Sequence, residues 1–167
     1  MKFAPLGFLV SPIAIAAVDI LLLFPMVLSI YDVTKSVTGH ADTHEPVTIT
    51  STVALMMIGW GVALEERLAI RKVFGVHGRA DEARQVVVDD QCHAYGVAQL
   101  VLGLFAEIAV AMIALPDRII NTHGLEHALL AIALVLMAIA SLVQLRHVFV
   151  LLWGMIRPAP PKEAHVT

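Results

Sequence analysis

The chain has 167 residues, of which 59% are hydrophobic, and its mean hydropathy is +0.83. Soluble domains are about 45–50% apolar, so this composition indicates a membrane protein. The formal net charge of −3 argues against a nucleic-acid partner. Cys92 is the single cysteine, which excludes an internal disulfide framework, and we expect it to be a small packing residue.

Four apolar stretches follow one another along the chain, at about residues 6–30, 49–66, 93–115 and 126–156. A helix needs roughly 20 apolar residues to cross the hydrocarbon core of a bilayer. Because lipid offers no hydrogen bonds to the backbone, spanning segments of this length must be helical. The sequence therefore predicts an all-α integral membrane protein, a single domain (1–167) with four transmembrane helices in an antiparallel bundle.

A charged segment, residues 65–74, follows the second stretch and has apolar residues at helical spacing. We expect it to form a helical cytoplasmic extension of that span. Orientation follows from the basic residues, which concentrate on the cytoplasmic side of membrane proteins. Residues 67–84 contain five of them, whereas the first and third loops contain one each. We therefore expect both termini to be cytoplasmic, in a bacterial inner membrane.

Two acids lie near the middle of predicted spans, Asp19 in the first and Glu107 in the third. An ionised side chain is costly at that depth, and no Lys or Arg lies level with either acid. We expect both to face protein, and to be protonated or hydrogen-bonded to polar groups. Two interpretations stay open: a relay for protons or cations, and a hydrogen bond that docks one helix on another.

Two histidines, His93 and His147, are expected near the cytoplasmic ends of the third and fourth spans. We place both on the inner helix faces, with Gly96 one turn from His93 leaving room for a macrocycle. Two axial histidines in one leaflet fit a b-type haem. The pair therefore predicts haem b as one alternative cofactor.

A second group of metal-ligating side chains is predicted on the outer side of the membrane. Imidazole and carboxylate together suit a transition metal such as zinc, copper, nickel or iron. The spacing follows no recognised zinc motif. The candidate ligands are His40, His44, His123, Glu126 and His127.

Small and polar residues recur at helical spacing on each span, a pattern typical of faces that contact other helices. On the second span, Gly59 and Gly61 point to different faces, one for the bundle and one for a neighbour. No catalytic motif is recognisable. The favoured function is an accessory or structural subunit of a larger membrane complex, such as a respiratory or photosynthetic one.

Such a subunit would contact other transmembrane subunits and the lipid bilayer, with bound lipid expected. The alternative is a small redox protein, or a protein that translocates protons or cations. It would use His93 and His147 for haem, or Asp19 and Glu107 for ion movement.

Overall fold

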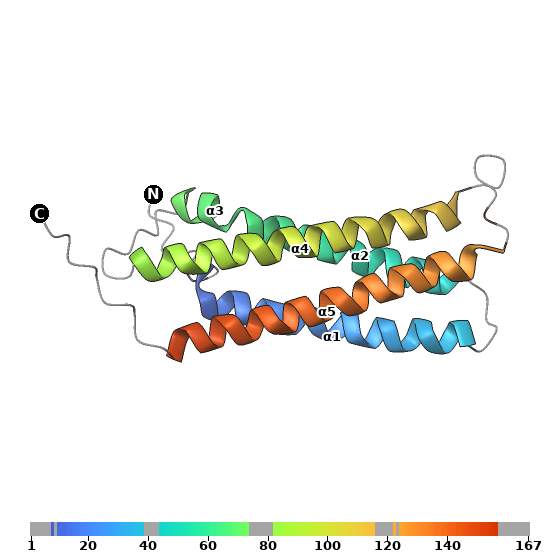
Figure 1. Ribbon diagram of the computed structural model, residues 1–167, viewed down its shortest axis with the longest axis horizontal. Coiled ribbons are helices and arrows are strands. Elements are labelled where there is room, and N and C mark those ends of the chain that lie inside the picture. Colours follow the sequence, from blue (N-terminus) through green and yellow to red (C-terminus); the bar gives the residue numbers. More distant parts are fainter. Residues whose placement is uncertain are drawn as a thin grey trace, which may run out of the picture.

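The computed structural model describes residues 8, 10–38, 44–73, 82–115, 122 and 124–156. This described part holds five α-helices and no strand. Figure 1 shows the four long helices lying side by side along the long axis of the molecule. The helices are α1 (Pro12–Thr38), α2 (His44–Glu65), α3 (Arg67–Val73), α4 (Glu82–Ala114) and α5 (Glu126–Ile156).

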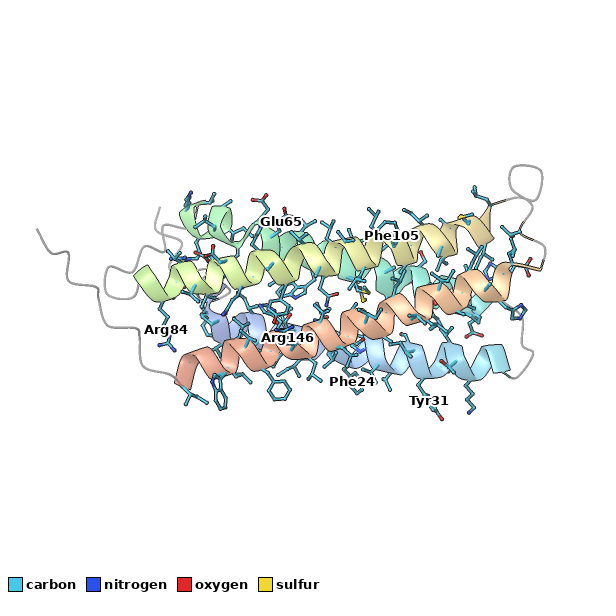
Figure 2. All side chains as sticks on the ribbon, in the orientation of Figure 1. Phe24, Tyr31, Glu65, Arg84, Phe105 and Arg146 are labelled. Atoms are coloured by element: carbon cyan, nitrogen blue, oxygen red, sulfur yellow. The ribbon has the colours of Figure 1, made fainter. Side chains whose placement is uncertain are left out.

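The long helices α1, α2, α4 and α5 are each long and apolar enough to cross a membrane, which confirms the prediction of four spans. Only 28–33% of each apolar window is buried within the chain. Phe24 on α1 and Phe105 on α4 are examples of the large side chains that face outward (Figure 2). The outer surface of the bundle is therefore apolar and suited to lipid or to another membrane protein.

Helix bounds differ from the sequence expectation in three of the four spans, and α2 begins at His44 rather than near residue 49. The helix α1 runs over residues 12–38 rather than about 6–30, and its first turn is capped by Ser11, whose Oγ accepts a hydrogen bond from Ala14 N at 3.2 Å. The helix α4 begins at Glu82 rather than near residue 93. In its second turn, Asp89 is paired with side chains of α3.

The segment after the second span is helical, as predicted, but forms a separate element. A turn at Glu66 separates α2 from α3. Helical backbone bonds continue across it, from Glu66 N to Val62 O at 3.0 Å and from Ile70 N to Glu66 O at 2.9 Å. The helix α3 therefore follows directly on α2.

The closest helix contact is between α2 and α4, at two glycines. A Cβ atom added to Gly61 would lie 2.7 Å from the backbone nitrogen of Leu100 and 2.8 Å from the carbonyl oxygen of Gly96. Such distances leave no room for a side chain, so both glycines are needed for this approach. Gly59 has no atom within 4 Å of the same position. Gly61 therefore serves the bundle, and Gly59 lies on an open face.

The four long helices close into a ring, in which α2 packs against α4, α4 against α5, α5 against α1, and α1 against α2. One end of the ring is defined by Arg67, which contacts Val10 before α1 and Asp89 near the start of α4. At that end α1 and α4 begin, and α2 and α5 finish (Figure 1). Polar side chains from all four helices meet inside the ring between this end and its middle.

Candidate functional site in the bundle interior

Asp19 lies at the centre of the interior polar site and is completely buried. Its Oδ1 accepts a hydrogen bond from Trp60 Nε1 at 2.7 Å. Gln144 Nε2 donates to the backbone carbonyl of Asp19 at 3.0 Å and lies 3.4 Å from Oδ1. His147 Nδ1 lies 2.8 Å from Oδ2, at ion-pair distance but without an aligned hydrogen bond. Side chains of α2 and α5 thus contact one acid of α1.

The helix α4 joins this site through Gln99. Its Nε2 donates to Gln144 Oε1 at 2.7 Å and to the carbonyl oxygen of Ala140 at 3.2 Å. All four spans therefore contribute to one connected set, which we call the interior polar network. Its members are Asp19, Trp60, Gln99, Gln144 and His147.

His147 also contacts α4 through its ring. Its Nε2 lies 3.7 Å from Cys92 Sγ, and the imidazole stacks on Tyr95 with ring centroids 4.6 Å apart. Thiol, imidazole and the Asp19 carboxylate thus stand in the order used by cysteine nucleophiles. All three groups are at most 1% exposed. The arrangement therefore acts in this structure as a buried contact between helices.

The surroundings of Cys92 explain why its thiol is enclosed. One apolar cluster packs around it, and Trp60 lies against the same cluster. A substrate could reach the thiol only by displacing these side chains. As the sequence predicts, Cys92 is a small packing residue. The cluster consists of Ile15, Ala16, Leu64, Val88, Cys92 and Leu151.

A second buried polar group lies at the end of the bundle where α1 begins. Arg67 is 2% exposed and donates to Val10 O at 2.8 and 3.2 Å and to Gln85 Oε1 at 3.0 Å. Asp89 forms ion pairs with both Arg67 and Arg71. Burial lowers the pKa of the Arg67 guanidinium, and the nearby Asp89 carboxylate opposes that shift. The group ties α3 and the start of α1 to α4.

From the sequence alone, Arg67 and Arg71 are expected in the exposed extension after the second span, and Asp89 is expected in a loop. The one signal available is the spacing of Arg67 and Arg71, which puts both guanidiniums on one helix face. That spacing does not reveal which acid they share. The acid, Asp89, is far along the chain and is brought to them by the packing of α3 on α4.

Glu107 occupies a different and more open position on α4. Ser51 Oγ of α2 donates to its Oε1 at 2.9 Å, whereas its Oε2 is buried without a hydrogen-bond partner among the described residues. The carboxyl group lines a pocket of about 470 Å³ between α2 and α4. Thr48 and Thr52 line the same pocket, and their hydroxyls donate to their own helix backbone. Glu107 is therefore the acid that opens on the surface of the bundle.

The structure does not bring the two predicted acids together. Along α4, Gln99 and Glu107 are about 12 Å apart at 1.5 Å per residue. An apolar layer fills the bundle between the interior polar network and Glu107. Any relay between the acids would have to cross this layer, which contains Met26, Val53, Met57, Met137 and Ala140.

The two predicted haem ligands also lie apart. His147 is buried in the interior polar network, but His93 is exposed, so the expectation that His93 faces inward is wrong. Residues 92 and 93 both lie about one turn before Gly96, and the helix turns Cys92 inward instead. Because His147 directs its two nitrogens at Asp19 and Cys92, the pair does not fit a haem held between them.

The predicted metal ligands are described only in part. His40 and His123 lie outside the described residues. His44 and His127 are exposed, and Glu126 is half-buried, at the first turns of α2 and α5. Within the described ranges, no three His, Cys, Asp or Glu side chains gather in a way that could hold a metal ion. The five-residue metal site stays a prediction.

Similarity to known proteins adds nothing to this picture. The chain matches no protein-family model, no curated protein and no solved structure. Its function is therefore inferred from its own residues.

Proposed function

We propose that this chain is an accessory or structural subunit of a larger membrane complex, such as a respiratory or photosynthetic one. Its four spans form an antiparallel bundle in a bacterial inner membrane. The observation that supports this function best is the state of Glu107. One of its carboxyl oxygens is buried and has no hydrogen-bond donor among the described residues, although the group lines a pocket open to the side of the bundle.

The membrane makes such an acid informative. A carboxyl group that faces acyl chains costs several kcal/mol, so acids within spans are usually partnered. Ser51 supplies one donor, to Oε1. The carboxyl group lines the pocket, so a neighbouring transmembrane helix can supply the second donor when the carboxyl turns its buried Oε2 towards the pocket. Interhelical hydrogen bonds and small side chains are the main means by which helices associate in lipid. The pocket offers a hydrogen-bonding group in Glu107, and small side chains beside it in Ala111 and Ala114.

The adjoining face of α2 suits close approach by another helix. Thr52, Met56 and Gly59 are exposed and follow one another at helical spacing, at i, i+4 and i+7. A Cβ atom added to Gly59 would meet no other atom within 4 Å. We call this surface, together with the Glu107 pocket, the α2–α4 face. It offers a neighbouring helix a shallow, partly polar surface on which to pack.

The proposed orientation puts both termini and α3 in the cytoplasm. Arg67, Arg71 and Lys72 lie on α3, at the end of the bundle where α1 begins. Lys35 is the basic residue in the last turn of α1, towards the other end. The excess of positive charge therefore supports a cytoplasmic location for the end that carries α3.

Co-purification of the tagged chain from its native membrane tests the proposed function. Gly59→Leu should reduce recovery of other transmembrane chains several-fold, because it adds bulk to the α2–α4 face without a clash inside the bundle. Glu107→Leu should act in the same direction. Ala131→Leu is the matched control, since Ala131 is exposed on α5.

Gly61 is unsuitable for this experiment because a larger side chain there would push α2 away from α4. The outcome that opposes the proposal is equal recovery of partner chains with all three variants. Recovery of the wild-type chain without any other transmembrane protein would oppose it as well.

A second candidate function, proton translocation, is favoured by one observation. Asp19 and His147 lie 2.8 Å apart and fully buried within the spans, so two side chains of the types that carry protons stand side by side. Buried pairs of this kind line proton paths in pumps and transporters. Proton uptake by proteoliposomes distinguishes the two functions. Asp19→Asn abolishes uptake if the pair carries protons, and it changes only stability if the pair docks helices.

A further inference from the structure

A groove lies between α4 and α5, on the side of the ring next to the α2–α4 face and towards the end of the bundle where α4 begins. Its volume is about 650 Å³, and its walls are mainly apolar. Val87 of α4 faces Leu142, Leu145 and Phe149 of α5 across it. Arg146 lines the same groove and is exposed (Figure 2). A cationic side chain thus lies in an apolar groove on a surface that meets the membrane.

The charge of Arg146 is not balanced within the described part of the chain. It forms no hydrogen bond or ion pair with another described residue. Gln91 is the other polar side chain on the groove wall, and it carries no charge. The groove therefore lacks an anion among its lining residues, and an occupant with a negative charge would complement it.

The depth of Arg146 in the membrane indicates where a complementary anion would lie. The helix α5 has 31 residues, or about 46 Å, whereas the hydrocarbon core is about 30 Å thick. If the helix is centred, Arg146 lies roughly 7 Å inside the core boundary on the side of Ile156. Long basic side chains reach the interface from such a depth. Trp153 lies two turns closer to the helix end, at the level where aromatic residues meet lipid headgroups.

We propose that this groove binds one acidic phospholipid of the leaflet on the side where α1 begins and α5 ends. The Arg146 guanidinium holds the phosphate through paired N–H donors, and Gln91 supplies a further polar contact. An acyl chain lies along the apolar wall made by Val87, Leu142 and Leu145. A lipid fits better than a partner's carboxylate, because Arg146 reaches the phosphate plane while the rest of the groove needs only hydrocarbon.

Native mass spectrometry of the full-length protein tests this site. The protein is equilibrated with phosphatidylglycerol or phosphatidylcholine carrying the same acyl chains. The wild-type protein should retain one phosphatidylglycerol in preference to phosphatidylcholine. Arg146→Gln should lower that preference about fivefold, since one basic residue near the surface contributes about 1 kcal/mol. Lys72→Gln is the matched control and should leave the preference unchanged, because Lys72 lies on α3, away from the groove.

A second variant tests the apolar wall. Gly154 lines the groove and has no atom within 4 Å of an added Cβ, so Gly154→Leu fills the groove without disturbing the fold. It should lower retention of both lipids. Equal retention of the two lipids by the wild-type protein would overturn the proposal, as would an unchanged preference in Arg146→Gln. A photoreactive residue at position 142, on the groove wall, that crosslinks to another protein instead of lipid would also overturn it.

Discussion

Asp19 shows how a single acid can organise four helices inside a membrane. Its carboxylate and backbone carbonyl are held by Trp60 of α2 and by Gln144 and His147 of α5. Gln99 extends these bonds to α4. No hydrophobic effect drives helices together in lipid, so such polar contacts fix which helix faces meet. The cost of placing an acid at this depth is offset by the donors around it.

Replacing Asp19 should therefore destabilise the bundle. Asp19→Ala removes three side-chain contacts, at roughly 0.6 kcal/mol each, and should lower the free energy of unfolding by about 2 kcal/mol. Asp19→Asn keeps an oxygen acceptor for Trp60 and should cost about half as much. Thermal unfolding in detergent measures both. Asp32→Ala, at an exposed position of α1, is the control, and an equal loss in Asp32→Ala would contradict the assignment.

Asp89 holds two guanidiniums, so its removal should be more damaging. Asp89→Ala leaves the buried Arg67 and its neighbour Arg71 without their carboxylate, and should lower the free energy of unfolding by about 3–5 kcal/mol. Asp90→Ala alters the next residue, which is exposed, and should have little effect. Denaturant titrations of the two variants decide the point. Similar midpoints for both would show that the ion pairs contribute little.

The site residues differ in how far the sequence predicts them. The depth of Asp19 in an apolar stretch and the helical spacing of Gln144 and His147 predict an interior position, and the structure agrees. The contact between Asp19 and His147 joins the first and last spans, and no local pattern specifies it. His93 shows the limit of spacing, because positions one apart on a helix can be equally near a face residue such as Gly96.

At the scale of elements, the α2–α4 contact depends on glycine. Gly61 and Gly96 bring the two backbones so close that even a methyl group would meet main-chain atoms at 2.7–2.8 Å. Main-chain atoms cannot move aside as a side chain can. The two helices would have to separate, and the hydrogen bonds of the interior polar network near this contact would lengthen with them.

Gly61→Ala and Gly96→Ala should each lower the free energy of unfolding by about 1–3 kcal/mol, the usual cost of overpacking. Gly59→Ala should have no such cost, because its added Cβ lies in open space. Unfolding of the three purified variants by a denaturing detergent compares them directly. If Gly59→Ala were as unstable as Gly61→Ala, the close approach of α2 and α4 would not be the cause.

The sequence predicts the bounds of an element best where the apolar stretch and the helix end at the same residues. The predicted span 126–156 and the helix α5 have the same bounds. The predicted start of α4 is too late. Arg84, Asp89 and Asp90 are charged, and charged residues whose partners are unknown are assigned to a loop. Asp89 of that segment forms ion pairs with α3, and no local sequence pattern specifies these contacts.

At the scale of the whole molecule, the apolar outer surface and the uneven distribution of basic residues imply a defined orientation. Cysteine labelling tests it after Cys92→Ala removes the native thiol. Lys72→Cys on α3 should react with an impermeant maleimide only after the membrane is opened, whereas Leu125→Cys, before α5, should react from outside the cell. Both positions are at least partly exposed. The reverse pattern would show that the charge distribution does not set the orientation.

The two outward-facing polar groups, Glu107 and Arg146, favour two different kinds of neighbour at two different parts of the surface. Glu107 lies on the α2–α4 face, where a second transmembrane chain can supply its missing donor. Arg146 lies in the groove between α4 and α5, where a lipid phosphate can reach it. Each group would be costly against acyl chains alone. We therefore propose that the chain is incomplete as a monomer in plain hydrocarbon.

The measurement that tests this conclusion most directly is the mass of the particle extracted from the native membrane in lipid nanodiscs. We expect a complex that contains at least one other transmembrane chain, and we expect Gly59→Leu to reduce its abundance while the chain itself stays folded. A monodisperse wild-type monomer, folded and without a protein partner in the same nanodiscs, would contradict the proposed role as a subunit.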